Sequence, residues 1–267
     1  MFAGFNLAMP EECLVDGYYG KGADYLRSQK SKIEDNLMSS ICESESESID
    51  GTSLQENWFP ALKMDAFLSH SHKDEKLTVA LAGWLHDECG VDSFVDSFIW
   101  GYADDLLKIM DNCYCVKSKT ETNTTYDYQL RNRTTSHVHM MLNVAIQNMI
   151  DRSECLLFVN TPNSMMVKNS MQGGGTTLSP WIYSEIAFSQ IVRHRKLSEY
   201  RCGGTENVTR KDALFEHAEL KVGYSVSTEH LEKLSFTDLE KWKQDIDKCK
   251  KTITYPLDLL YRRMSLI

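Results

Sequence analysis

A short segment at residues 179–185, with the sequence SPWIYSE, carries an indole and a carboxylate at a spacing that could hold a small molecule. Ser179 is a favourable N-cap because its hydroxyl can accept an N–H of the first helical turn, and Pro180 suits the first helical position. Trp181 and Glu185 lie four residues apart and therefore share one face of the predicted helix. Such a pair could bind a ribose or an aromatic heterocycle, although a surface Glu beside a half-buried Trp gives the same pattern.

Two other segments place polar side chains at the ends of predicted strands. Residues 64–69 form an apolar run of strand length, which ends in a polar turn. Asp74 can then begin a helix over residues 75–89. Residues 92–96 alternate like a second strand, and the loop that follows contains Trp100. Ligands of open parallel sheets bind beyond the carboxyl ends of the strands, so we expect both loops to border one cleft.

Strands and helices alternate along the rest of the chain. The uninterrupted apolar run CLLFV at residues 155–159 is typical of a central strand covered on both faces. The alternation predicts a parallel sheet with helices on both faces. The expected strands lie at 64–69, 92–96, 154–160 and 220–226, and the expected helices at 75–89, 102–111, 139–150, 180–196 and 237–251. The loop after residue 160 joins the predicted cleft, with Glu185 in an open position beside it.

In this order, the three motif segments resemble the Toll/interleukin-1 receptor (TIR) domain family, in particular its bacterial members. The first is DAFLSHSHKD at residues 65–74, the second is the strand that ends at Asp96, and the third is SPWIYSE. The resemblance covers residues 61–200 and extends loosely to 267. It implies a flavodoxin-like fold with a central parallel sheet and helices on both faces.

The resemblance also implies an activity and a set of site residues. It makes Glu185 the catalytic glutamate of an NAD+ glycohydrolase or cyclase, which cleaves the nicotinamide–ribose bond. The products would be nicotinamide with ADP-ribose or a cyclic ADP-ribose-type signal, and bacterial relatives imply a role in antiphage defence. NAD+ is then the substrate, and no cofactor or metal is needed. The expected substrate-binding residues are Ser69, His70, Ser71, Asp96, Trp100 and Trp181.

Two other classes of protein compete with this interpretation. A non-catalytic TIR scaffold would act through protein–protein assembly alone, but it would not require Glu185. A phosphoacceptor receiver domain needs an acidic cluster at its strand ends, whereas the first strand here ends in Ser69 and His70. Relatives that transfer nucleosides by cleaving N-glycosidic bonds are a further alternative.

The composition limits the location and the partners. The chain has 267 residues, of which 42% are hydrophobic and 25% charged. It contains no apolar stretch of membrane-spanning length and no signal peptide, so we expect a cytoplasmic protein without a membrane partner. The net charge of −9 argues against nucleic acid as the main partner. Phe98 and Trp100, in a predicted exposed loop, favour a homo-oligomer, and a cyclic product would act on a separate effector protein.

The first 57 residues differ from the rest of the chain. The Glu/Ser run at residues 43–48 cannot bury itself and is typical of a linker. We therefore expect a helical and linker extension at 1–57 that is dispensable for folding, and a TIR domain at 58–267. A polar insertion is expected at 113–136.

Two patterns that suggest other sites are weak. Cys113 and Cys115, followed by His137 and His139, depart from the usual spacing of zinc ligands, so we expect no metal. The glycines at residues 173–175 lack the lysine that follows a phosphate-binding loop, which favours a flexible loop.

Overall fold

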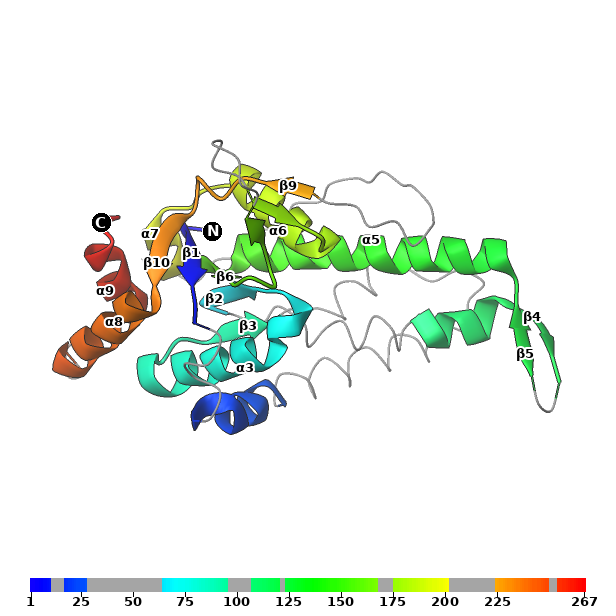
Figure 1. Ribbon diagram of the computed structural model, residues 1–267, viewed down its shortest axis with the longest axis horizontal. Coiled ribbons are helices and arrows are strands. Elements are labelled where there is room, and N and C mark those ends of the chain that lie inside the picture. Colours follow the sequence, from blue (N-terminus) through cyan, green and yellow to red (C-terminus); the bar gives the residue numbers. More distant parts are fainter. Residues whose placement is uncertain are drawn as a thin grey trace.

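A parallel sheet of five strands forms the centre of the molecule (Figure 1). The computed structural model describes residues 1–10, 17–27, 64–95, 107–120, 123–167, 175–201, 224–249 and 254–267. The strands stand in the order β10-β1-β6-β2-β3, and every neighbouring pair is parallel. Their bounds are β10 (Glu232–Ser235), β1 (Ala3–Ala8), β6 (Cys155–Asn160), β2 (Ala66–Ser69) and β3 (Ser93–Val95).

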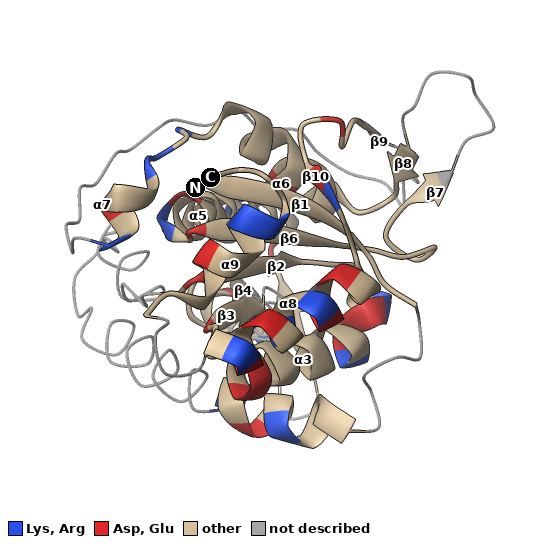
Figure 2. Cartoon of the chain, turned by 90° about the vertical axis from the view of Figure 1, so that its left-hand side faces the viewer, with Lys and Arg blue, Asp and Glu red and all other residues tan. Residues whose placement is uncertain are grey.

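Helices cover both faces of this sheet, which confirms the predicted α/β class. The helices α3, α8 and α9 pack on one face, and α5 and α6 pack on the other (Figures 1 and 2). Figure 2 also shows Lys and Arg mixed with Asp and Glu on α8 and α9. The bounds are α3 (Glu75–Trp84), α5 (Tyr128–Arg152), α6 (Pro180–Ile191), α8 (Phe236–Cys249) and α9 (Pro256–Arg263).

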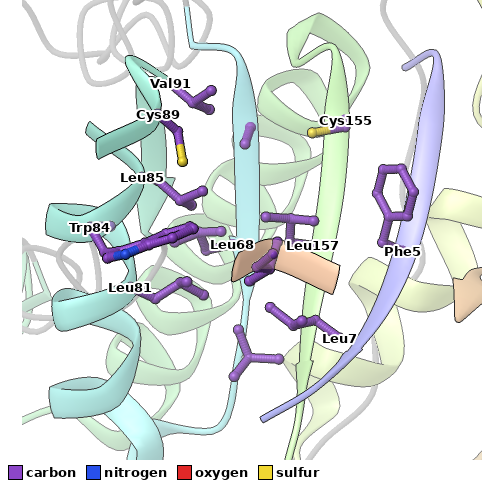
Figure 3. Packing of buried hydrophobic residues seen from close by; sticks show 14 of the residues in the cluster. Phe5, Leu7, Leu68, Leu81, Trp84, Leu85, Cys89, Val91, Cys155 and Leu157 are labelled. Atoms are coloured by element: carbon purple, nitrogen blue, oxygen red, sulfur yellow. The ribbon is translucent and has the colours of Figure 1, made fainter. Parts of the chain in front are cut away.

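Alternate residues of the strands face opposite helical layers, as the pleat of a strand requires. Leu68 and Leu157 belong to the hydrophobic cluster under α3, whereas Phe67 and Leu156 belong to the cluster under α5 and α6. Figure 3 shows the first cluster, where side chains of three strands lie opposite those of α3 and the π-helical turn Leu85–Cys89 that follows it. Strands β2 and β6 are therefore buried on both faces.

The first strand corrects the predicted domain boundary. β1 lies between β6 and β10 and pairs with both, so it belongs to the centre of the sheet. Phe5 and Leu7 are both 0% exposed. The prediction that residues 1–57 form an extension outside the domain is therefore wrong for this strand. A linker that follows a strand in sequence does not limit where that strand packs, because sheet pairing is non-local.

The helical residues 17–27 also pack on the domain. A Cβ atom on Gly22 would lie 1.9 Å from the carbonyl oxygen of Val79 in α3, and one on Gly83 would lie 2.5 Å from the backbone nitrogen of Gly22. The two backbones thus touch where both residues lack a side chain. The hydroxyl of Tyr18 donates a 2.8 Å hydrogen bond to Glu88 beside this contact.

The strand order creates a switch point between β2 and β6. The part β3-β2-β6 has the 2-1-3 order of a flavodoxin-like sheet, with which the fold is compatible. β1 stands where that fold places the fourth strand along the chain. From β2 the chain continues to β3 on one side, and from β6 it continues towards β10 on the other. Ligands of open α/β sheets bind at such a point, beyond the carboxyl ends of the strands.

The predicted strand at 220–226 is wrong as a member of the central sheet. Its described part, β9 (Tyr224–Val226), pairs antiparallel with β8 (Gly175–Thr177), which in turn pairs with β7 (Met166–Val167). Its expected place is taken by β10, where Glu232 and Lys233 are exposed. A charged edge strand has little apolar signal in the sequence.

Beyond the sheet, α5 begins at Tyr128 rather than at the predicted residue 139. An antiparallel hairpin of β4 (Val116–Lys119) and β5 (Thr124–Tyr126) precedes it and occupies much of the predicted insertion. Residues 107–114 are helical and include the described end of the helix predicted at 102–111. The short elements η1 (His72–Asp74) and α7 (Leu197–Arg201) are also present. None of the described helices has the length and apolarity that a membrane crossing requires.

Replacing Phe5 with Ala should lower the free energy of unfolding by about 3–5 kcal/mol, because it leaves a cavity in the centre of the core. Urea unfolding of the full chain measures this change. The matched control is Tyr19→Ala, since Tyr19 is 41% exposed. Equal stability of the Phe5 variant and the wild-type protein would contradict the central position of β1.

Candidate functional site

Helix α6 begins as its sequence predicts. The hydroxyl of Ser179 accepts a 3.3 Å hydrogen bond from the backbone N–H of Ile182, and Pro180 occupies the first turn. The backbone N–H of Ser179 donates to the hydroxyl of Thr177 at the end of β8. A Cβ atom on Gly175 would lie 2.1 Å from the sulfur of Met165. Gly175 is a residue of strand β8 in contact with the Met165 side chain, which corrects the predicted flexible loop at this position.

The carboxylate of Glu185 is buried against the end of β2. The hydroxyl of Ser69 donates a 2.5 Å hydrogen bond to its Oε2 atom. Ser69 is 0% exposed and Glu185 is 1% exposed. The expectation that Glu185 lies in an open position is therefore wrong. The motif spacing placed the carboxylate on the correct helix, but it could not show how closely that helix packs on the sheet.

A carboxylate in this environment is costly to bury. Moving an ionised group out of water requires hydrogen bonds or opposite charges in compensation. The neighbours of Glu185 on α6, Ile182 and Ile186, belong to the apolar core. A buried acid at the switch point of a parallel sheet is a candidate functional group on physical grounds.

Polar side chains continue across the sheet from Ser69, on the face under α6. Ser69 pairs with Phe158 of β6, and Phe158 pairs with Asn6 of β1, so the three residues are neighbours across the sheet. The side chain of Asn160 donates a 2.9 Å hydrogen bond to Asn6, and Asn6 donates a 3.2 Å hydrogen bond to the hydroxyl of Thr228. We call Asn6, Asn160 and Thr228 the amide row.

The amide row was not predicted from the sequence. One signal was present, since Asn6 interrupts an apolar alternation in GFNLA with a side chain that cannot be buried without partners. Asn160 is the last residue of β6 and faces the same side as Phe158. The row extends the polar end of the sheet from β2 to the N-terminal strand.

A second polar contact fixes the far end of α6. Ser189 is 0% exposed. Its hydroxyl donates a 2.7 Å hydrogen bond to the carbonyl of Ile186, and the Nε2 atom of His230 lies 2.8 Å from the same oxygen. The hydroxyl of Ser189 and the imidazole of His230 are thus within hydrogen-bonding distance, and the contact joins α6 to the segment before β10.

The loops after β2 and β6 meet across the switch point, as predicted. Asp74 accepts a 2.6 Å hydrogen bond from the hydroxyl of Thr161 and a 2.7 Å hydrogen bond from the side-chain amide of Asn163. Asp74 is the N-cap residue of α3, as predicted, but its side chain forms no hydrogen bond to the first turn of that helix. Ser71 instead accepts from the backbone N–H of Lys73 and starts the turn η1.

The remaining predicted site residues have different positions. His70 and Ser71 are buried next to Ser69, with 4% and 8% exposure. Trp181 is partly buried, and its ring meets the ring of His139 edge-on at 5.9 Å. It therefore packs against α5 one turn before Glu185. Asp96 and Trp100 lie outside the described residues.

The cysteine and histidine pairs do not converge. Cys115 is buried beside the hydroxyl of Thr134, whereas Cys113 is exposed. His137 is exposed, and His139 faces Trp181. Within the described ranges, no three His, Cys, Asp or Glu side chains are grouped as metal ligands.

No protein-family model matches this chain, and comparisons with curated proteins and with solved structures give no match either.

Replacing His230 with Gln should make stability less dependent on pH. Burial lowers the pKa of His230 below its ordinary value of 6.5. The unfolded chain therefore binds a proton just below this pH that the folded chain does not. Above pH 6.5, the burial of His230 does not lower the free energy of unfolding, because the imidazole is neutral in the unfolded chain as well. The free energy of unfolding decreases as the pH falls below 6.5, because only the unfolded chain then binds the proton.

Urea unfolding on either side of pH 6.5 measures this effect. The matched control is Lys233→Gln, which changes an exposed side chain on the adjacent strand. If the His230 variant and the wild-type protein lost the same stability on acidification, the burial of this imidazole would not contribute.

Proposed function

We propose that this protein is a TIR-type NAD+ glycohydrolase or cyclase with Glu185 as its catalytic residue. The observation that carries the proposal is the buried hydrogen bond between Ser69 and Glu185 at the switch point of the sheet. It joins the first and third motif segments, whose residues lie 116 positions apart in the chain. A scaffold that works only through its surface does not require a buried carboxylate at this place.

The chemistry follows from the charge of the bond that breaks. In NAD+ the nicotinamide nitrogen is positively charged, and cleavage of its bond to the ribose returns the bonding electron pair to that nitrogen. Positive charge then develops on the ribose in an oxocarbenium-like transition state. A fixed carboxylate beside the ribose stabilises this charge more than it stabilises the ground state. Water, or a nitrogen of the adenine ring, then adds to the same carbon and releases a proton in the hydrolysis.

Ser69 has a positioning role in this proposal. Its hydroxyl holds one oxygen of Glu185 at 2.5 Å and so fixes the orientation of the carboxylate. A group that is already oriented needs no reorganisation when charge develops. The amide row lies on the same face of the sheet and offers hydrogen-bonding groups for the hydroxyl or amide groups of the dinucleotide.

The burial of Glu185 adds a requirement. Glu185 is 1% exposed, so neighbouring side chains must move before a ribose can reach its carboxylate.

In this proposal the product serves antiphage defence, either by depletion of NAD+ or as a signal to a separate effector, and the active form is a homo-oligomer.

Glu185→Gln should reduce NAD+ consumption by about 10²-fold or more, because it removes the charge that stabilises the transition state. Its stability should be equal to that of the wild-type protein or higher. The amide has the same size and can still accept from Ser69, and it removes a buried charge. Chromatography of nicotinamide and the ribose-containing product measures turnover, with the melting temperature recorded in parallel.

The matched control is Glu240→Gln, which removes an exposed carboxylate on α8 and should leave turnover unchanged. A folded Glu185 variant with full activity would exclude Glu185 as the catalytic residue. A wild-type protein that consumes no NAD+ would favour the scaffold instead.

A further inference from the structure

The amide row begins close to the candidate catalytic carboxylate. Ser69, which holds Glu185, pairs with Phe158 of β6. Asn160 follows Phe158 by two residues on the same strand and faces the same side of the sheet. With strands about 4.8 Å apart and a rise of about 3.3 Å per residue, the Cα atoms of Ser69 and Asn160 are about 8 Å apart. A small heterocycle between the two positions could therefore touch both.

The residues of the row are accessible from outside the core. Asn6, Asn160 and Thr228 are each partly exposed. They lie near the carboxyl ends of β1 and β6 and in the segment before β10. Glu185, by contrast, is 1% exposed. The row is thus the accessible part of the polar end of the sheet, and a ligand can contact it first.

Hydrogen bonds within the row use only part of its capacity. An asparagine side chain has one carbonyl oxygen and two N–H donors. Asn160 donates one N–H to Asn6, and Asn6 donates one N–H to Thr228. Among the described residues, the structure gives no partner to the side-chain carbonyl oxygen of Asn160 or to its second N–H. Asn160 therefore offers an acceptor and a donor on one planar group.

This pair of groups is complementary to a primary carboxamide. The carboxamide of nicotinamide has an oxygen that accepts and an NH2 that donates, as an asparagine side chain does. Two such amides can pair, with an N–H of each donating to the oxygen of the other. The carboxamide is attached to the pyridine ring whose nitrogen bonds the ribose. Only the width of that ring separates it from the bond that breaks.

The row is also uncharged, which suits a group whose charge disappears during the reaction. The pyridine ring is cationic in NAD+ and neutral once it has left. A carboxylate beside the carboxamide would stabilise the cationic ground state and so oppose cleavage. Neutral amides hold the ring in both states without this cost.

We infer that Asn160 binds the carboxamide of the nicotinamide ring and makes the site selective for dinucleotides that carry its NH2. The inference rests on the proposed function, in which Glu185 faces the ribose. Asn6 has a positioning role, because its carbonyl oxygen accepts from Asn160 and fixes the plane of that amide. The hydrogen bond from Asn6 to Thr228 holds Asn6 in turn. A site built to hydrogen-bond an N–H group rejects an analogue without it, because the acceptor in the site then loses its partner.

Turnover of NAD+ and of its methyl ketone analogue separates this role from a structural one. The analogue has the same charge and nearly the same size, and its oxygen can accept, but it has no N–H to donate. The kcat/KM of the wild-type protein should be about 10-fold or more higher for NAD+ than for the analogue. In Asn160→Ala this preference should largely disappear. A general loss of folding would lower both rates and leave their ratio unchanged.

The matched control is Asn143→Ala. Asn143 is also a partly exposed asparagine with one side-chain hydrogen bond, which it accepts from Ser184 of α6. This variant should retain the preference of the wild-type protein. An unchanged preference in Asn160→Ala, or an equal change in the control, would overturn the inference and leave the proposed function intact.

Binding of free nicotinamide tests the same contact without turnover. Saturation-transfer NMR should show that the wild-type protein binds nicotinamide more tightly than the corresponding methyl ketone, and that Asn160→Ala does not distinguish them. This result from a protein that consumes no NAD+ would support the carboxamide site and contradict the proposed function. A protein that neither binds nicotinamide nor consumes NAD+ would overturn both.

Discussion

The buried hydrogen bond between Ser69 and Glu185 is the interaction on which the arrangement of the site depends. A carboxyl group that is 1% exposed needs hydrogen-bond partners, and the partner on β2 restricts where α6 can lie. The helix has to cross the carboxyl end of β2 closely enough for a serine hydroxyl to reach Oε2. The N-cap at Ser179 and its contact with β8 set the start of the helix, and the contact between Ser189 and His230 sets its far end. Glu185 lies between these two fixed points.

The two faces of the sheet that supports this helix differ in polarity. The face under α3 is apolar from β1 to β3, and it supplies most of the burial (Figure 3). The face under α6 becomes polar at its carboxyl end, where Ser69, Asn160 and Asn6 succeed one another across three strands. Natural proteins break the rule of an apolar core mainly at functional sites. The N-terminal strand is therefore part of the candidate site as well as part of the core.

Sequence reasoning was accurate where the signal is local. The strand at residues 66–69, the strand at 155–160 and the start of α6 each carry a pattern within a few residues. The place of β1 depends on pairing with β6, about 150 residues away, and no local pattern reports it. The charged edge strand β10 lacks the apolar signature of a buried strand. The burial of Glu185 follows from helix-to-sheet packing, which motif spacing does not contain. The contact with Ser69 could be anticipated only through the resemblance of both motifs to one family.

A double-mutant cycle on NAD+ turnover tests whether Ser69 acts through Glu185. The four proteins are the wild type, Ser69→Ala, Glu185→Gln and the double variant, each checked for folding by its melting temperature. Residues that act as one unit show strongly non-additive losses. The account predicts that Ser69→Ala lowers turnover in the wild-type background and has no further effect once Glu185 is Gln. The same fold-loss in both backgrounds would show that Ser69 and Glu185 act independently and would contradict the account.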